Sequence, residues 1–508
     1  MSPLCPLPRS RIGNDRKGPL PGALALFFRS VAVFCLAGTV GCPSGSGTSG
    51  VADGPGPCGP GSDIHGDFEA AVLDCPLDRP LTKVDVSDIL VVQNPGNVLS
   101  CFVEWKTSVK ALSELTVSCA DDIVYTLSGQ SAATEHRAFV MGLYVGAECN
   151  LEVVARTPDG AVGNATTSLA VGQVPDFLPP LTVLDSQPSK VQPGWTLFNL
   201  TNSYAKLPLV VAIFDENGRY RWYHRRAVTD TGADTDTRTL PEGILVGGTH
   251  GHVLPALIDW QGNVVWERKI FMHHDLRPFG DQGLLLYLTD TWACGLEHPS
   301  GAVVAWDPLP DKKLWKWNLC DHFLPKSIDS DWSHLNAAAL PPDDSYMLVS
   351  SRNQDAIFKV SLPDGKVLWK LGGQSGGDFI VAPEDSFLRQ HDPEIQPDGS
   401  ILLFDNGLAE KREYSRALQL ALDETSMTVT RVFEYRHDPD IFSPVWGDAD
   451  RLPNGNTLIL FGQRDQKRPT RFSEVTPEGQ KVSDIALPPS WGAYRAERFT
   501  ELRYGYMQ

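Results

Sequence analysis

The sequence lacks an excess of basic residues. Its 508 residues carry 44 lysines and arginines against 62 aspartates and glutamates, a formal net charge of −18. A nucleic-acid binder needs a basic face, so we expect no nucleic-acid partner. Only 21% of the chain is charged while 42% is hydrophobic. This composition excludes a globally disordered protein.

Motifs for metal ions and nucleotides are also missing. The chain contains no HExxH or CxxC pattern and no GxxxxGK loop. Three of the histidines discussed below could still bind Zn²⁺ or Cu²⁺, but an arginine beside them disfavours a cation. We therefore expect no metal site and no cofactor.

The first 41 residues have the character of an export signal. Five basic residues and one acid precede or flank the start of an apolar run, SVAVFCLAGTVG, which is too short for a permanent membrane span. Cys42 follows, and a Gly/Ser/Pro-rich linker extends from residue 42 to residue 83. The arrangement resembles a bacterial lipoprotein signal, although Thr39 stands where an aliphatic residue is usual. We expect a lipid anchor on Cys42 at the periplasmic or outer-membrane face of the cell envelope, with a soluble secreted protein as the alternative.

Ten cysteines are too few for a disulfide scaffold in a chain of this length. If the chain is exported, the seven cysteines that follow Cys42 can be oxidised to disulfides. Seven is an odd number, so at least one of these cysteines stays unpaired. We predict a Cys294–Cys320 bridge, while Cys101–Cys119 and Cys119–Cys149 remain alternatives. The seven are Cys58, Cys75, Cys101, Cys119, Cys149, Cys294 and Cys320.

Residues 84–175 are the first folded segment that we predict. Short alternating strands such as DILVVQN and LTVSCA are separated by the turns NPGN and PDG. Roughly seven strands in a segment of this length are typical of a β-sandwich. The pieces NPGNVLSCFVEW and LYVGAECNLEVVA resemble a fibronectin type III or immunoglobulin-like module, which implies a spacer and no activity of its own.

Residues 180–508 alternate between two kinds of hairpin. A turn followed by an aromatic strand lies near residues 217, 261, 300, 364, 425 and 478, and turns followed by apolar strands, such as PEGILVGG, lie between them. These spacings are those of four-stranded units. We therefore predict an all-β chain whose main domain is a six-bladed β-propeller, with five or seven blades as alternatives.

The histidines are concentrated in this repeat, where ten of the 12 lie between residues 224 and 437. His274, His334 and His391 each precede the turn of an apolar hairpin by a similar number of residues. Equivalent positions of successive blades meet at one end of the central channel, so we expect the three imidazoles to lie together. Arg352 shares a blade with His334, and an arginine with imidazoles suits a tetrahedral oxyanion such as sulfate or phosphate.

The motifs that contain these residues resemble those of the bacterial arylsulfate sulfotransferases. In order they are DWSHLN, SSRNQDAIFKV, GKVLWKLGG, RQHDP, LLFDNG, YSRAL, VFEYRH and FSPVWGD, between residues 331 and 448. The resemblance extends over 180–508. It implies an exported enzyme with a six-bladed propeller that moves a sulfuryl group from an aryl sulfate to a phenol without a nucleotide donor; we also allow for a homodimer.

The resemblance also implies roles for single residues. RQHDP makes His391 the nucleophile that becomes a sulfohistidine, which predicts ping-pong kinetics. DWSHLN places His334 on the sulfate oxygens with Asn336 beside it. SSRNQ makes Arg352 the anion clamp, although Asn353 stands where some members have histidine.

The segment FMHHDLRPFGDQG supplies the remaining histidine. Its spacing to the turn favours His274 as catalytic, and His273 is kept as a substrate-binding candidate. Phenols could stack on Trp332, Phe387 or Trp446, among which the sequence does not choose. Two other functions stay open: a surface propeller that binds a protein or a glycan, and a hydrolase of sulfate or phosphate esters that uses the same pocket.

Overall fold

The computed structural model describes residues 83–507 except 120–122, 203–207, 227–234, 281, 326–327, 375, 464–466 and 501–504. The chain divides into two compact units, 1–81 and 82–508. The predicted signal, Cys42, and the linker up to residue 82 lie outside the described residues, as do Cys58 and Cys75. Within the described part, no helix is long and apolar enough to cross a membrane.

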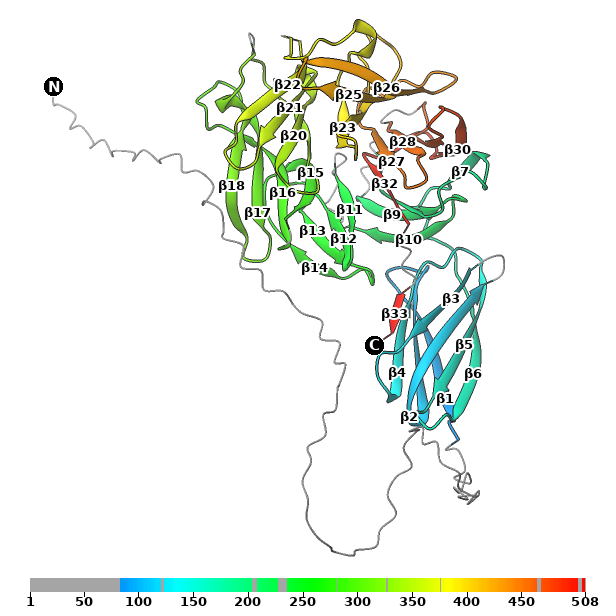
Figure 1. The fold of residues 1–508 in the computed structure, drawn as a ribbon. Helices are drawn as coiled ribbons and strands as arrows, with labels where there is room; N and C mark the ends of the chain where they lie inside the picture. Colours follow the sequence, from blue (N-terminus) through cyan, green and yellow to red (C-terminus); the bar gives the residue numbers. More distant parts are fainter. Residues whose placement is uncertain are drawn as a thin grey trace, which may run out of the picture. The chain divides into compact units, whose positions relative to one another are not determined.

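Seven antiparallel strands form the first sheet (Figure 1). Six of them lie within residues 84–175, where the sequence predicts a β-sandwich, and the seventh comes from the end of the chain. The long strand β2 organises it: its first half pairs with β1 and β4, and its second half pairs with β3 and β5. The strands are β1 (Val86–Gln93), β2 (Cys101–Cys119), β3 (Ile123–Ser128), β4 (Ala133–Val140), β5 (Glu148–Arg156), β6 (Val162–Ala170) and β33 (Gly505–Met507).

Two disulfides are present among the described residues. Cys294–Cys320 is the bridge predicted from the sequence, and Cys119–Cys149 is one of the two alternatives that the sequence left open. Cys119 and Cys149 are directly opposite each other on β2 and β5, which brings their side chains together. Cys101 is a buried free cysteine, and burial raises the pKa of its thiol to about 12.

Six further antiparallel sheets make up the propeller, so the predicted blade number is confirmed. Figure 1 shows them arranged around a common axis. The first two blades contain β8 (Trp195–Asn202), β9 (Val210–Asp215), β10 (Tyr220–Arg225), β31 (Trp491–Gly492) and β32 (Ala496–Phe499), and then β11 (Thr237–Leu240), β12 (Gly243–Val246), β13 (Ala256–Asp259) and β14 (Val264–Glu267).

The middle blades carry His274 and His334, and three short 3₁₀ helices lie in or directly after them. The third contains β15 (His273–Phe279), β16 (Leu284–Thr291), β17 (Ser300–Asp307) and β18 (Lys312–Asn318), followed by η1 (Leu319–Asp321). The fourth contains β19 (Leu335–Ala339), β20 (Tyr346–Ser351), η2 (Arg352–Gln354), β21 (Ala356–Ser361) and β22 (Val367–Gly372), and η3 (Pro383–Asp385) leads onward.

The last two blades complete the ring. They contain β23 (His391–Ile395), β24 (Ile401–Asp405), β25 (Arg416–Asp423) and β26 (Thr428–Arg436), and then β27 (Asp448–Arg451), β28 (Thr457–Phe461), β29 (Arg471–Val475), β30 (Lys481–Ala486) and the early strand β7 (Thr182–Ser186). Because β7 pairs with β30 and β32 pairs with β8, both ends of the propeller chain are tied into blades. Such pairing protects sheet edges.

One predicted turn is wrong. Ser300 and Gly301 lie inside strand β17, and the outer hairpin of that blade turns between β17 and β18 instead. Gly301 is required by packing, since a Cβ added there would lie 2.3 Å from Cγ of Leu335 on the next blade. The glycine therefore marks a close contact between blades and not a turn.

Candidate active site

The three predicted catalytic histidines lie at the end of the propeller where the innermost strands begin. His274 is the second residue of β15, His334 directly precedes β19, and His391 is the first residue of β23. The ring centroids of His274 and His334 are 4.8 Å apart. Tyr494, just before β32, contacts the rings of both His274 and His391, at 5.8 and 6.1 Å. The structure thus brings residues of four blades together.

Irregular backbone aims these side chains. His274 and His334 have φ angles of 62° and 38°, in the left-handed region that residues other than glycine seldom adopt. The pairing of β15 with β16 shifts between His273 and Leu276, and that of β23 with β24 shifts after His391. Bulges of this kind re-aim side chains at functional sites.

His391 is a buried, neutral imidazole with a defined tautomer. Asn406 donates from Nδ2 to the carbonyl oxygens of Ser443 and Trp446, each at 2.7 Å, so its Oδ1 must face His391. That oxygen is 2.7 Å from His391 Nδ1, which therefore carries the proton and donates. Burial and then the charge of Arg352 lower the pKa of His391 to about 3. The Nε2 atom thus keeps its lone pair at neutral pH, as a nucleophile requires.

His334 has a different partner. Its Nδ1 lies 2.7 Å from Oδ2 of Asp331, three residues earlier in the same loop. Burial acts to raise the pKa of Asp331, but hydrogen bonding and the charge of His334 outweigh it and lower that pKa below 3.8. The carboxyl group is therefore ionised at neutral pH and faces one edge of the ring.

Arg352 is held beside His334. Its backbone N–H donates to the carbonyl oxygen of His334 at 3.0 Å, across the β19–β20 hairpin. Its guanidinium donates from Nη1 to Asn353 Oδ1 and from Nη2 to the carbonyl oxygen of Pro444, both at 2.9 Å. Asn353 in turn donates from Nδ2 to Asp331, so one amide links the arginine to the partner of His334.

The two adjacent histidines of β15 take different places. His274 faces His334 and Tyr494, while His273 lies behind it and approaches Asp290, whose Oδ1 is 3.5 Å from His273 Nε2. The Nδ1 atoms of His273 and His274 are 2.8 Å apart, so one of them carries the shared proton. Burial and the surrounding imidazoles hold the pKa of His274 well below 6.5.

The sequence reasoning missed His250. Its ring stacks on His273 at 5.0 Å and meets His274 edge-on at 6.4 Å. It follows the second strand of its blade, as Arg352 follows the second strand of another. This position in the repeat could have indicated His250, because the second strand of each blade finishes on the side of the propeller where the innermost strand begins. Tyr494 was missed because the sequence analysis looked for histidines at equivalent positions of the repeat, and a tyrosine gave no such signal.

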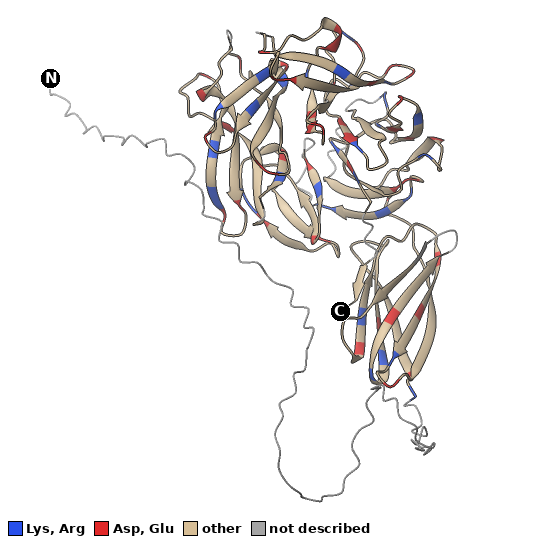
Figure 2. Cartoon of the chain, viewed as in Figure 1, with Lys and Arg blue, Asp and Glu red and all other residues tan. Residues whose placement is uncertain are grey.

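A network of ion pairs fills the channel next to the histidines. The guanidinium of Arg495 lies 3.3, 3.4 and 3.1 Å from carboxylate oxygens of Asp236, Asp275 and Asp392. Although burial acts in the opposite direction, arginines led by Arg277 hold the pKa of Asp275 well below 3.8. Figure 2 shows charges of both signs on the strands around the axis. This network fixes the inner strands in place.

Three carboxyl groups of the same channel are close enough to hold a metal ion. Atoms of Asp392, Asp448 and Asp450 lie within 4.8 Å of one another. Burial and mutual repulsion raise the pKa of Asp448 and Asp450 well above 3.8. A proton shared between Asp392 and Asp448 accounts for the approach of these two carboxyl groups.

Residues 181–495 match the family model described as arylsulfotransferase (ASST). The chain belongs to the arylsulfotransferase family. It is similar to the arylsulfate sulfotransferase AssT of Escherichia coli O6:H1, with 26% identity over 167 residues that cover 26% of this chain and 28% of that protein. The match therefore spans less than a third of the relative's length.

Solved structures with low similarity to this chain include a Bacteroides caccae protein of unknown function, at 14% identity and a TM-score of 0.42, which covers 61% of this chain and 100% of its own. The periplasmic gluconolactonase of Pseudomonas aeruginosa has 10% identity and a TM-score of 0.31, with 77% and 99% covered.

Asn336 lies inside the propeller, away from any open surface. Its side chain is fully buried, and Nδ2 donates to the carbonyl oxygen of Gln390 at 2.8 Å, directly before His391. The backbone carbonyl oxygen of Asn336 accepts from the Tyr494 hydroxyl and from Arg495 Nη2. Asn336 thus ties three blades together behind the histidines.

The suggested stacking platforms for phenols are wrong. Trp332, Phe387 and Trp446 are all buried in the core of the propeller, with at most 4% of their surface exposed. Exposed aromatic side chains instead occur on loops at the histidine end of the third blade, at Phe271 and Trp292. The ring of Phe271 contacts that of His250 at 5.4 Å.

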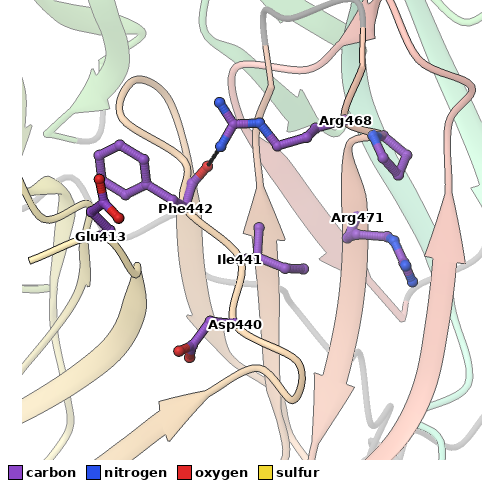
Figure 3. Close-up of a pocket in the computed structure, with 7 residues that line it drawn as sticks. Glu413, Asp440, Ile441, Phe442, Arg468 and Arg471 are labelled. Atoms are coloured by element: carbon purple, nitrogen blue, oxygen red, sulfur yellow. Dashed lines mark hydrogen bonds between the residues drawn. The ribbon is translucent and has the colours of Figure 1, made fainter. Parts of the chain in front are cut away.

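The loop from Asp440 to Trp446 contacts the histidine site on one side and a separate pocket on the other. One supports the site, because its carbonyl groups hold Arg352 and Asn406. The other lines a pocket of about 500 Å³ with charged residues of both signs (Figure 3). Glu413, Asp440, Ile441, Phe442, Arg468, Pro469 and Arg471 line it.

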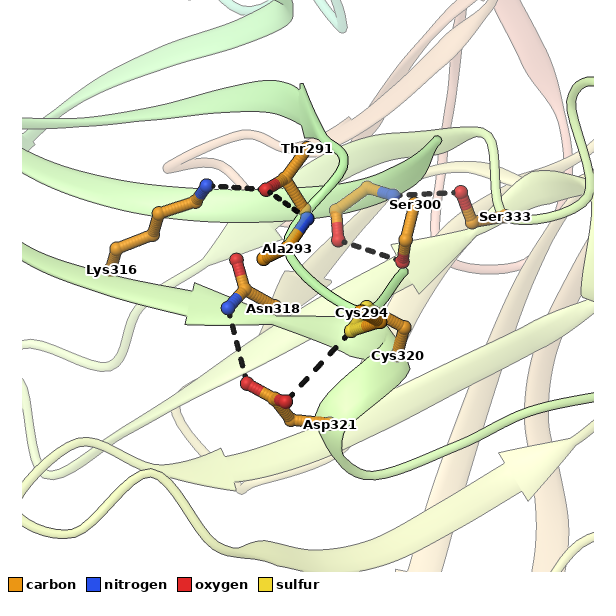
Figure 4. Close-up of a disulfide and its surroundings, with 10 residues drawn as sticks. Thr291, Ala293, Cys294, Ser300, Lys316, Asn318, Cys320, Asp321 and Ser333 are labelled. Carbon is orange, nitrogen blue, oxygen red and sulfur yellow. Dashed lines mark hydrogen bonds between the residues drawn. A yellow bond between two sulfur atoms is a disulfide. The ribbon is translucent and has the colours of Figure 1, made fainter. Parts of the chain in front are cut away.

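The Cys294–Cys320 bridge ties the loop after β16 to η1 (Figure 4). Nearby, the N–H of Gly301 donates to Ser333 Oγ at 2.9 Å, one residue before His334. The bridge thus braces the third blade where it adjoins the loop that carries Asp331 and His334.

Proposed function

We propose that the protein transfers a sulfuryl group from an aryl sulfate to a phenol, with His391 as the nucleophile. The observation that carries the proposal is the environment of His391: a buried neutral ring with its Nε2 lone pair available, beside an arginine. Membership of the arylsulfotransferase family supports the same reaction class.

In the first half of the reaction, His391 Nε2 attacks the sulfur of the donor. The N–S bond forms as the S–O bond to the aryl group breaks, and the bond's electron pair leaves with the phenolate oxygen. Arg352, with His274 and His334, stabilises the charge on the equatorial oxygens. A proton from an imidazolium of the site neutralises the phenolate.

In the second half, the hydroxyl oxygen of an acceptor phenol attacks the sulfohistidine. The phenol proton passes to the imidazole that gave one up before, and the electron pair of the N–S bond returns to His391 Nε2. Two sequential displacements through one covalent intermediate predict ping-pong kinetics.

The test is to mix the purified protein with 4-nitrophenyl sulfate, with and without a second phenol, and to follow nitrophenolate and the sulfated acceptor. We expect release that depends on the acceptor, and a mass increase of one sulfuryl group on the peptide that contains His391 when the acceptor is omitted. Release independent of any phenol would identify a hydrolase, and no release from the folded protein would leave a binding propeller.

We further propose that the chain is exported and anchored by a lipid on Cys42, with strands β1–β6 as a fibronectin- or immunoglobulin-like spacer. The apolar run before Cys42 supports the anchor, and the pairing of β2 with two different sets of strands supports the module. Membrane fractionation after palmitate labelling tests the anchor, with Cys42→Ser expected to abolish both labelling and sedimentation.

A further inference from the structure

His391 and His334 differ in the group that faces the Nδ1 atom of the ring. His391 faces the neutral amide oxygen of Asn406, and His334 faces a carboxylate oxygen of Asp331, both at 2.7 Å. A neutral acceptor fixes a tautomer without favouring the charged ring. A carboxylate fixes the same tautomer and also stabilises the imidazolium form.

The Asp331 carboxylate is held in place by more than His334. Its Oδ2 also accepts from Asn353 Nδ2 at 3.1 Å, and the same Nδ2 lies 2.6 Å from the Asp331 carbonyl oxygen. Asn353 Oδ1 accepts from Arg352 and Arg389, so the orientation of this amide is determined. The anion clamp and the carboxylate are therefore positioned by a single side chain.

His334 is also placed to exchange protons with a substrate. Its side chain is 24% exposed, whereas His391 is buried. The hydrogen bond from the N–H of Arg352 to the His334 carbonyl holds the two residues side by side. A sulfate ester bound by Arg352 would present its bridging oxygen close to this ring.

We propose that Asp331 is a positioning residue that makes His334 the proton-transfer group of the site, while Asn406 keeps His391 as the nucleophile. In the first half-reaction, the Nε2–H of the His334 imidazolium gives its proton to the departing phenolate oxygen as the S–O bond breaks. In the second, the neutral Nε2 takes the proton of the acceptor hydroxyl. This assignment rests on the proposed sulfuryl transfer and adds which histidine moves the proton.

The experiment compares Asp331→Asn with Asp329→Asn over aryl sulfates whose phenols range from acidic to weakly acidic: 4-nitrophenyl, phenyl and 4-methoxyphenyl sulfate. Asparagine keeps an acceptor for His334 but removes the charge. The Asp329 carboxylate accepts from the N–H of Asp331 and contacts no histidine in the described part of the chain, so Asp329→Asn is the matched control.

For Asp331→Asn we expect kcat/KM to fall about 10- to 100-fold with 4-methoxyphenyl sulfate and less than about threefold with 4-nitrophenyl sulfate, because a good leaving group needs no proton. Asp331 is 59% exposed, so the loss should be smaller than for a buried catalytic aspartate. Asp329→Asn should leave all three values within about twofold of the wild type.

A loss that is equal for all donors would show a merely structural role and overturn the inference, and so would no loss at all. In both cases acceptor-dependent turnover by the wild type would leave the proposed function standing. A wild type without turnover of any aryl sulfate would overturn both. Competitive inhibition by inorganic sulfate, unchanged in Asp331→Asn, checks that the Arg352 clamp is intact.

Discussion

The backbone N–H of Arg352 donates to the carbonyl oxygen of His334 at 3.0 Å. These residues are 18 positions apart in the sequence, at the start and just after the end of the β19–β20 hairpin. The hairpin thus fixes the distance between an imidazole and a guanidinium that would contact the same anion. A shift in the register of this hairpin would separate them, because their distance depends on which residues of the two strands are paired.

Replacing His391 with alanine should abolish sulfuryl transfer. We expect kcat to fall by at least about 10³-fold, because no other described side chain places a neutral nitrogen at that position. The truncation leaves Asn406 Oδ1 without its donor, so the free energy of unfolding should fall by about 1–3 kcal/mol while the fold persists. Steady-state assays with 4-nitrophenyl sulfate and thermal unfolding measure the two effects.

His322→Ala is the matched control for this variant, since His322 is exposed and stacks on Trp317 at the edge of the third blade. It should retain transfer. Near-normal transfer by His391→Ala would contradict the assigned nucleophile.

Asn406→Asp should make activity more sensitive to acid. A carboxylate behind Nδ1 favours the imidazolium form and raises the pKa of His391 from about 3. Because only the neutral ring attacks sulfur, the acid limb of the kcat/KM profile should move to higher pH by at least about one unit. A pH–rate profile of both proteins measures the shift, and an unchanged acid limb would argue against the Asn406–His391 hydrogen bond.

Glu394→Gln should stabilise the protein above neutral pH. Burial and the charge of Asp392 raise the pKa of Glu394 from 4.5 to about 7. The folded state then binds this proton more tightly than the unfolded state, so the stability due to Glu394 is complete below pH 4.5 and is lost as pH rises through 7. Glutamine has no proton to lose.

Urea unfolding on either side of this range tests the point. At about pH 8 the variant should exceed the wild type by about 1–2 kcal/mol, and the difference should shrink at about pH 5. A difference that does not depend on pH would mean that Glu394 does not titrate in this window.

Removing the Cys294–Cys320 bridge should lower stability and leave the fold intact. The bridge closes a loop of 26 residues, for which the loss of unfolded-state entropy is worth about 3 kcal/mol. Denaturant unfolding of the Cys294→Ser/Cys320→Ser protein measures it. Cys101→Ala, at a free cysteine, is the control, and its loss should stay nearer about 1 kcal/mol. Equal losses in the two proteins would show that the bridge contributes no more than ordinary packing.

Much of the architecture could be read from the sequence because it depends on local patterns. Alternating apolar strands with turn residues at blade-length intervals predicted six blades, and the structure has six. The error at residue 300 arose because a glycine that makes room for Leu335 looks, in the sequence, like a turn glycine. Only the neighbouring blade distinguishes the two uses.

The site was predicted in part for the same reason. Repeat position placed His274, His334 and His391 at one end, and the motifs added Arg352. His250 and Tyr494 were missed, since their residue types do not recur at the equivalent positions of other blades.

The sequence by itself determined the blade repeat, the membership of the arylsulfotransferase family, and the residue types available at the channel mouth. Only the tertiary structure decided which histidine is backed by an amide and which by a carboxylate. Asn406 is oriented by carbonyl groups about 40 residues away in the chain, and Asp331 by an amide beyond the next hairpin. Whether an imidazole is charged depends on its neighbours in space, and these neighbours are brought together only when the propeller folds.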